Sequence, residues 1–215
     1  MKQLRHTLLT PYHFSLPYLG ALWYGFPSKK LLVIAVTGTK GKSSVTEMIS
    51  AILEAAGHKT ALLNSIRFKI GDESERNTLR MSMPGRWFIQ RFLRRAVDAK
   101  CTAVILEMTS EGARQYRHRA IALDALVFTN LAPEHIESHG SYEAYADAKF
   151  EIGKQLARSS KRPRIMVANA EDPQSARYLA LPVEKQIGVS LSQHAHQSNE
   201  RGGSLEFDGT KLGVH

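Results

Sequence analysis

The feature that most constrains the fold is a short apolar segment followed by a loop of glycines and lysines. Residues 31–36, LLVIAV, are continuous and apolar, which predicts a buried strand. The loop TGTKGK follows directly, and residues 43–56 then predict a helix that stops at Gly57. The apolar positions of this helix, expected to face the core, are Val45, Met48, Ile49, Ile52 and Leu53. A strand, a glycine loop and a helix in this order predict a sheet with helices packed on it.

Strands and helices alternate along the rest of the chain. Further strands are predicted at residues 60–64, 102–108, 124–130 and 164–169, and further helices at 85–99 and 141–158. Residues 65–84 are polar and predict a hairpin or an active-site loop. The helix over 85–99 has a basic face of Arg91, Arg94 and Arg95. The expected fold class is α/β: a P-loop-type, mostly parallel sheet flanked by helices on both faces.

The two ends of the chain differ from this core, which spans residues 31–215. Residues 1–30 form an aromatic and basic extension. Within it, residues 14–27 contain two prolines and are shorter than the roughly 20 residues of a membrane span. They predict a short helix packed on the domain, with a weak membrane-surface anchor as the alternative and no stable span. At the other end, GGSLEFDGTKLGVH predicts a hairpin around Asp208-Gly209 that stops as its second strand begins, so the domain is expected to be incomplete.

Charge and cysteine content narrow the class of partner and compartment. The formal net charge of +9 favours anionic partners, with a solvated basic surface as the alternative. The arginines of residues 86–119 could serve a nucleic-acid binder, which is the third alternative. A solvated helix face or contacts to substrate phosphates rank above it, so no nucleic-acid partner is expected. Cys101 is the single cysteine, which excludes an internal disulfide and fits a reducing, cytoplasmic compartment.

The glycine loop predicts a nucleoside triphosphate site. Gly38 and Gly41 let the backbone wrap closely around an anion, and the following helix N-terminus favours negative charge. Lys42 would reach the β- and γ-phosphates, and the Ser43 hydroxyl would bind Mg²⁺. The spacing is G-x-x-G-K-S, shorter than the common G-x-x-x-x-G-K-[ST], because residue 36 is Val.

Other polar residues follow the predicted strands, where open α/β sheets bind ligands. Glu107 ends an apolar strand, where a carboxylate is costly unless it is paired or bound to metal. Lys149 lies on the helix over 141–158. The segment after the strand over 124–130 offers Asn130, Glu134, His135, Glu137 and His139. Together with the loop, these residues predict a Mg²⁺–phosphate site.

Three motifs carry a resemblance to a known family. TGTKGKSSVTEMI, LEMTSEGARQYR and FTNLAPEHIESHGSYEAYADAK resemble, in order and spacing, the central domain of the Mur ligases. The similarity covers residues 31–215 and is strongest to the branch that adds the third residue to a UDP-N-acetylmuramoyl-peptide. It implies an ATP-dependent acid–amino-acid ligase of cytoplasmic peptidoglycan synthesis. In that chemistry a substrate carboxylate forms an acyl phosphate with ATP, and the amine of an amino acid then displaces phosphate.

The resemblance also implies roles for individual residues. The ATP-binding residues would be Gly38, Thr39, Lys40, Gly41, Lys42, Ser43, Ser44 and Asn130. One or two Mg²⁺ ions would be held by Ser43, Glu107, His135 and Lys149, the last as a carbamate. The muramoyl-peptide would contact Ser82, Ser110, Gln115 and Arg117. The catalytic residues would be Lys42, Glu107, His135 and Lys149.

The chain also departs from the family pattern. Met83 stands where a threonine is usual, Glu111 where the branch often has His, and Glu134 and Glu137 replace aspartates. The family's N-terminal UDP-binding and C-terminal amino-acid-binding domains have no counterpart, which implies a fragment, a partner chain that supplies the C-terminal domain, or a decayed gene. A folyl- or polyglutamate-type ligase, a lipid-linked cell-wall amidating partner and a non-catalytic ATP-binding module stay as alternatives. The incoming amino acid, the muramoyl peptide and the oligomeric state are left open.

Overall fold

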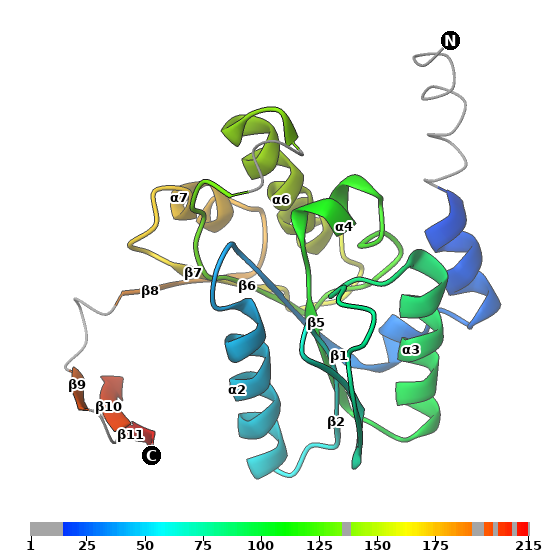
Figure 1. The fold of residues 1–215 in the computed structure, drawn as a ribbon, viewed down its shortest axis with the longest axis horizontal. Coiled ribbons are helices and arrows are strands. Elements are labelled where there is room, and N and C mark those ends of the chain that lie inside the picture. Colours follow the sequence, from blue (N-terminus) through cyan, green and yellow to red (C-terminus); the bar gives the residue numbers. More distant parts are fainter. Residues whose placement is uncertain (1–14, 135–138, 191–195, 200–201, 208–209, 215) are drawn as a thin grey trace.

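The core of the molecule is an eight-stranded mixed sheet with strand order β4-β3-β2-β5-β1-β6-β7-β8 (Figure 1). The computed structural model describes residues 15–134, 139–190, 196–199, 202–207 and 210–214. The strands are β1 (Leu32–Thr37), β2 (Thr60–Leu63), β3 (Arg67–Ile70), β4 (Glu73–Arg76), β5 (Ala103–Glu107), β6 (Ala125–Phe128), β7 (Ile165–Asn169) and β8 (Lys185–Val189). The helices are η1 (Pro27–Lys30), α2 (Lys42–Ala55), α3 (Arg86–Asp98), α4 (Ser110–Arg114), α6 (Tyr142–Ala157) and α7 (Ser175–Leu179).

The sheet is parallel except at one edge. Strands β2, β5, β1, β6, β7 and β8 run parallel, and the β3–β4 hairpin is antiparallel. In the centre, Val36 of β1 is in register with Glu107 of β5, and Thr37 is in register with Phe128 of β6. The ends of these three strands therefore meet at one edge of the sheet, where ligands of such sheets bind.

Helices cover both faces of the sheet. On one face, α2 packs Val45, Ile49 and Leu53 against Val36, Leu62 and Ile105. The larger core lies on the opposite face, where α3 and α6 pack against β1, β2, β5 and β6 (Figure 1). The α/β class and the helices on both faces are thus confirmed.

One detail of the predicted core is wrong. The sequence placed Met48 and Ile52 on the buried side of α2, but these side chains are 56% and 67% exposed. A single helix lying on a sheet buries a narrow stripe, and Val45, Ile49 and Leu53 at four-residue spacing fill it.

The predicted strands and helices all form, with boundaries that differ by one or two residues. The polar segment over 65–84 contains the predicted hairpin, as β3 and β4. Five elements were not predicted: α4, α7, β8, the short helix η1 and β9 (His196–Asn199). The first two have only five residues each, too few for an apolar period to show.

The N-terminal extension contains the predicted packed helix, over residues 15–23. Ala21 is fully buried, and Gly20 lies so close to α3 that a Cβ there would be 3.3 Å from the Trp87 ring. The Tyr24 and Trp87 rings pack edge-on, with centroids 5.6 Å apart. Within the described residues, none of the helices combines the length and hydropathy needed to cross a bilayer.

The C-terminal segment forms a separate antiparallel sheet of β9 (His196–Asn199), β10 (Gly202–Phe207) and β11 (Thr210–Val214). The predicted hairpin is confirmed as β10 and β11, although Asp208-Gly209 lies outside the described residues. The expectation that its second strand is only beginning is wrong, because β11 pairs with β10 from Thr210 to Val214.

Candidate functional site

Two glycines, Gly38 and Gly41, determine the backbone conformation of the loop between β1 and α2. Gly38 has φ 149°, and a Cβ there would lie 2.0 Å from Thr129 Oγ1 and 3.0 Å from the Asn130 carbonyl oxygen. Gly41, with φ 79°, is the N-cap of α2 and has open space around it. Gly38 is therefore required by close contact and conformation, and Gly41 by conformation alone.

Residues after β6 hold the loop in place. The Asn130 side chain accepts a hydrogen bond from the Lys40 amide (2.9 Å) and donates one to the Lys40 carbonyl (3.1 Å). The Thr39 amide donates to the Asn130 carbonyl (2.8 Å), and Thr129 Oγ1 donates to the Lys40 carbonyl (2.8 Å). Asn130, predicted beside the phosphates, thus fixes the backbone of the predicted phosphate loop.

The start of α2 concentrates positive charge at this loop. Lys42 is the first helical residue, Ser43 and Ser44 follow it, and the first turn contains no acidic residue. Lys42 Nζ donates to the Thr39 carbonyl (2.8 Å), so its ammonium group lies against the loop. Free amides at a helix N-terminus and a nearby lysine together favour a bound anion.

Glu107 is a buried carboxylate at the end of β5 whose oxygens all have donors. Its Oε2 accepts from Ser43 Oγ (2.7 Å) and the Ser65 amide (3.1 Å), and its Oε1 accepts from Ser82 Oγ (2.7 Å). These hydrogen bonds offset the desolvation cost of burying the Glu107 carboxylate, which the sequence predicts to be paired or bound to metal.

The Ser43–Glu107 pair suits a hard cation. A hydroxyl and a carboxylate oxygen in direct contact are ligands that Mg²⁺ prefers, and Mg²⁺ completes its shell with phosphate oxygens and water. Among the described residues there is no group of three or more His, Cys, Asp or Glu side chains placed to hold a metal. His135 and Glu137, the former predicted as a ligand, lie outside the described residues.

Lys149 is buried, and among the described residues no carboxylate lies in hydrogen-bond contact with it. It lies on α6, and its Nζ donates to the Gly38 carbonyl (2.5 Å) and lies 4.8 Å from the centre of the Tyr145 ring. Burial, together with the charge of Lys42, lowers the pKa of Lys149 to about 7. A large share of this amine is therefore neutral near neutral pH.

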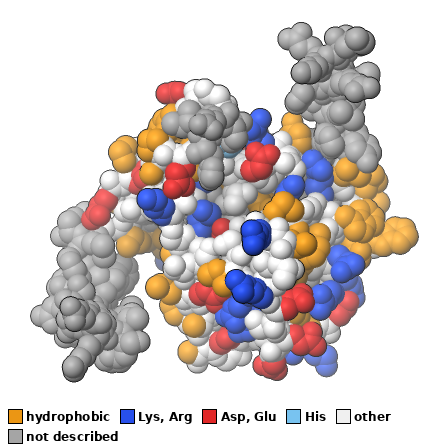
Figure 2. Space-filling view, viewed as in Figure 1, with side chains coloured by type: hydrophobic (Ala, Val, Ile, Leu, Met, Phe, Trp, Pro, Cys, Tyr) orange, Lys and Arg blue, Asp and Glu red, His pale blue; other side chains and the backbone are white. Residues whose placement is uncertain are grey.

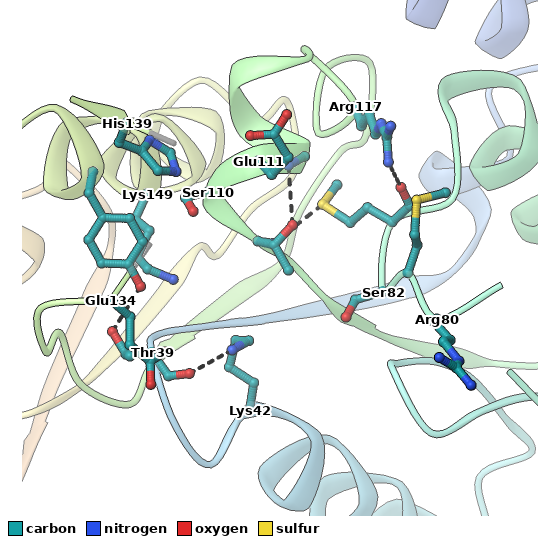
Figure 3. A pocket seen from close by; sticks show the side chains of 15 residues that line it. Thr39, Lys42, Arg80, Ser82, Ser110, Glu111, Arg117, Glu134, His139 and Lys149 are labelled. Carbon is teal, nitrogen blue, oxygen red and sulfur yellow. Dashed lines mark hydrogen bonds between the residues drawn. The ribbon is translucent and has the colours of Figure 1, made fainter. Parts of the chain in front are cut away.

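These elements surround one cavity of about 420 Å³ (Figure 3). Lys42 enters from α2, Lys149 from α6, Ser110 and Glu111 from α4, and Arg80 and Ser82 from the segment before α3 (Figure 3). The remaining lining residues are Thr39, Met81, Met83, Thr109, Gly112, Arg117, Glu134, His139 and Tyr145.

The residues predicted to contact the substrate divide into two groups. Ser82, Ser110 and Arg117 line the cavity. Gln115 does not line it; its amide donates to Glu111 Oε1 (2.6 Å), and its Oε1 accepts from Arg117 Nη2 (2.6 Å). Gln115 therefore orients two cavity residues in this structure.

Sequence reasoning missed several residues of the cavity. Tyr145 lies one helical turn before Lys149, and its hydroxyl is 3.0 Å from Thr39 Oγ1. The four-residue spacing to Lys149 was an available signal. The sequence gives no pattern that predicts Arg80, because this residue reaches the cavity from a loop in which its own backbone has φ 51°.

The fold and site together define a class: an α/β domain with a glycine-rich anion loop beside a buried acid and a buried lysine. The family model that matches is the Mur ligase middle domain, over residues 36–215. The chain belongs to the Mur ligase family.

Relatives in sequence carry related names. A UDP-N-acetylmuramyl-tripeptide synthetase of Roseiflexus sp. (strain RS-1) is 36% identical over 187 residues, which cover 83% of this chain and 36% of the relative. A UDP-N-acetylmuramoyl-L-alanyl-D-glutamate--2,6-diaminopimelate ligase of Geobacillus kaustophilus (strain HTA426) is 35% identical, covering 74% and 33%. The chain thus spans about a third of the length of these curated relatives.

Solved structures share the fold. A structure of UDP-N-acetylmuramoyl-L-alanyl-D-glutamate--2,6-diaminopimelate ligase matches 94% of this chain and 43% of its own, with a TM-score of 0.76 and 20% identity. Mycobacterium tuberculosis folylpolyglutamate synthase complexed with ADP matches 94% and 53%, with a TM-score of 0.71 and 16% identity. Both confirm the mostly parallel sheet flanked by helices.

Proposed function

We propose that this chain is the ATP-binding domain of a ligase that joins an amino acid to a UDP-N-acetylmuramoyl-peptide in cytoplasmic peptidoglycan synthesis. The observation that carries the proposal is that Lys42 and Lys149 line one cavity beside the Gly38–Ser43 loop, while the buried Glu107 accepts hydrogen bonds from Ser43 of that loop and from Ser82 of the cavity wall. The names of the relatives support the acceptor, and the ADP in the folylpolyglutamate synthase structure supports the nucleotide.

The residues divide the work of binding ATP. The loop amides of residues 38–43, with Lys40 and Ser44 at its sides, would hold the phosphates, and Lys42 would leave the Thr39 carbonyl to contact the γ-phosphate. Ser43 and Glu107 would hold one Mg²⁺, with His135 and a carbamylated Lys149 as ligands of a second. Bound Mg²⁺ would neutralise charge on the transferring phosphoryl group.

The reaction has two balanced steps. A carboxylate oxygen of the substrate bonds to the γ-phosphorus of ATP, the bond to the β–γ bridging oxygen breaks, and ADP leaves. The amine of the amino acid then bonds to the acyl carbon, phosphate leaves, and the amine loses a proton. Ser82, Ser110 and Arg117 would position the acceptor, because they line the same cavity as Lys42 (Figure 3).

The buried surroundings of Lys149 favour its carbamylation. Carbon dioxide adds to a neutral amine, which releases a proton and leaves an oxygen-rich anion. A buried amine with a pKa of about 7 supplies that neutral form. The carbamate of Lys149 would place carboxylate-like oxygens near Ser43 and Glu107, and it would replace the buried ammonium group of this lysine.

The test is product formation by the 215-residue chain, alone and with a partner chain that supplies a C-terminal ligase domain. Mg-ATP, a UDP-N-acetylmuramoyl-dipeptide and an amino-acid mixture should give ADP, phosphate and a new amide, and Lys42→Ala should give none. Reaction with a folate or polyglutamate acceptor would favour that branch instead. Mg-ATP binding without amide formation under every supplement would favour a non-catalytic module.

A further inference from the structure

An exposed apolar patch lies on the surface that the helix over 15–23 shares with the first turn of α3. Leu22 and Trp23 are 64% and 75% exposed, and Leu19 and Trp87 are exposed as well. We call these four residues the tryptophan patch. The Trp23 and Trp87 ring centroids are 6.2 Å apart, so the patch is continuous across the two helices. Figure 2 shows hydrophobic side chains gathered over this part of the molecule, with Lys and Arg side chains beside them.

The patch is not the packed side of its helix. Ala21 is fully buried and Gly20 contacts Trp87 and Gln90, so the opposite side of the helix already makes the contacts with α3. Single exposed apolar residues need no explanation, but a continuous group with two tryptophans marks an interaction surface. The packed helix therefore presents a second face that is exposed within the described part of the chain.

The surroundings of the patch are basic. Residues 1–46 contain no Asp or Glu. Lys29 and Lys30, in η1 against α3, are exposed, and Arg91 is exposed one helical turn after Trp87. Asp98, the single acidic residue of α3, is paired with Arg94. Arg91 therefore lies next to Trp87 on α3, while Lys30 lies near Asp98 towards the other end of that helix and Lys29 lies over the Phe26 ring. The acid of α3 is already paired.

We propose that the tryptophan patch binds the surface of an anionic lipid bilayer. Tryptophan is favoured at the level of lipid head groups, where its ring is half-apolar and its N–H stays wet. Lys29, Lys30 and Arg91 would face the lipid phosphates, each adding attraction to an anionic surface. A symmetric contact between two copies of this chain is disfavoured, since it would bring the two basic borders together. This inference stands independently of the proposed ligase activity.

The chain offers a direct probe, because its two tryptophans both belong to the patch. Vesicles of phosphatidylglycerol and phosphatidylcholine should shift tryptophan emission to the blue and sediment the chain, and phosphatidylcholine vesicles should do neither. Added salt should weaken binding. Leu22→Ser with Trp23→Ser should weaken sedimentation at least tenfold. The control is Met48→Ser with Ile52→Ser, an equally exposed apolar pair on α2, which should bind as the parent chain does.

Charge is tested separately. Lys29→Gln with Lys30→Gln should weaken binding about 30-fold, from about 1 kcal/mol for each cation at an anionic surface. Absence of binding to anionic vesicles, or equal binding by the Leu22→Ser/Trp23→Ser variant, would overturn the proposal. Self-association of the chain that this variant abolishes would also overturn it, and would assign the patch to a second copy.

Discussion

The neutral amine of Lys149 is the basis of a quantitative prediction. Its pKa of about 7 makes about 90% of the amine neutral at pH 8, whereas a lysine at its usual value of 10.5 is about 0.3% neutral. The reactive form is thus enriched about 300-fold over that of an exposed lysine. With carbon dioxide present, carbamate should form at Lys149 before any exposed lysine.

The assay is ¹³C NMR of the chain in ¹³C-labelled bicarbonate with MgCl₂. At pH 8 we expect a protein carbamate signal that is absent in Lys149→Met and retained in Lys185→Ala, a variant of an exposed lysine. The Lys149→Met spectrum also subtracts any carbamate of the α-amino group. The signal should weaken towards pH 6, where about 10% of the Lys149 amine is neutral. A Lys149→Met spectrum identical to that of the parent chain would refute the reasoning.

Three further predictions concern single residues. Burial lowers the pKa of His118 to about 4, and within the described part of the chain neither of its ring nitrogens has a hydrogen-bond partner. The unfolding free energy from urea titrations should therefore fall by about 3 kcal/mol as the pH falls from 6.5 to 4. His118→Leu should remove most of this slope, and an unchanged slope would contradict the prediction. Gly38→Ala should lower the unfolding free energy by about 1–3 kcal/mol in the same titrations, because its Cβ would overlap Thr129. Gly85 has an extended backbone and open space around it, so Gly85→Ala should change the unfolding free energy by less than about 0.5 kcal/mol. Glu107→Gln should change the unfolding free energy by no more than about 1 kcal/mol, because the Ser82 hydroxyl can turn to accept a hydrogen bond from the new amide. The same variant should remove the Mg²⁺ dependence of ATP binding in calorimetry. Retained dependence would exclude Glu107 as a Mg²⁺ ligand.

The pH argument for His118 depends on the direction of its shift. Its pKa is lower in the folded chain than the usual 6.5, so between pH 6.5 and about 4 the unfolded chain binds more protons. Stability must then rise with pH in that window. Arg119 and Arg158 oppose protonation and Glu151 favours it, while burial has the largest effect.

Much of the fold could be predicted because local patterns and tertiary packing agree. The strand over 31–36, the loop and the helix over 43–56 each have a residue pattern that agrees with how the segment is buried in the structure. Glu107 could be predicted as a site residue because a carboxylate after four buried apolar residues requires partners. Its partners, Ser43, Ser65 and Ser82, come from three separate segments.

The rest depends on contacts distant in sequence. Strand β8 lies at a sheet edge and is mostly exposed, so its sequence KQIGV has no buried alternation to detect. Met48 and Ile52 fit the helical period, and whether they are covered depends on what else lies on that face of the sheet. The low pKa of Lys149 arises from burial beneath the loop, which a single lysine in a helical sequence does not indicate.

Calorimetry of Mg-ATP binding to the 215-residue chain, with Lys42→Ala and Lys185→Ala measured beside it, tests whether the Gly38–Ser43 loop holds the ATP phosphates. We expect micromolar binding that Lys42→Ala abolishes and Lys185→Ala leaves unchanged. Equal binding by the parent chain and Lys42→Ala, or no binding by a folded parent chain, would contradict the assignment of the Gly38–Ser43 loop as an ATP phosphate site.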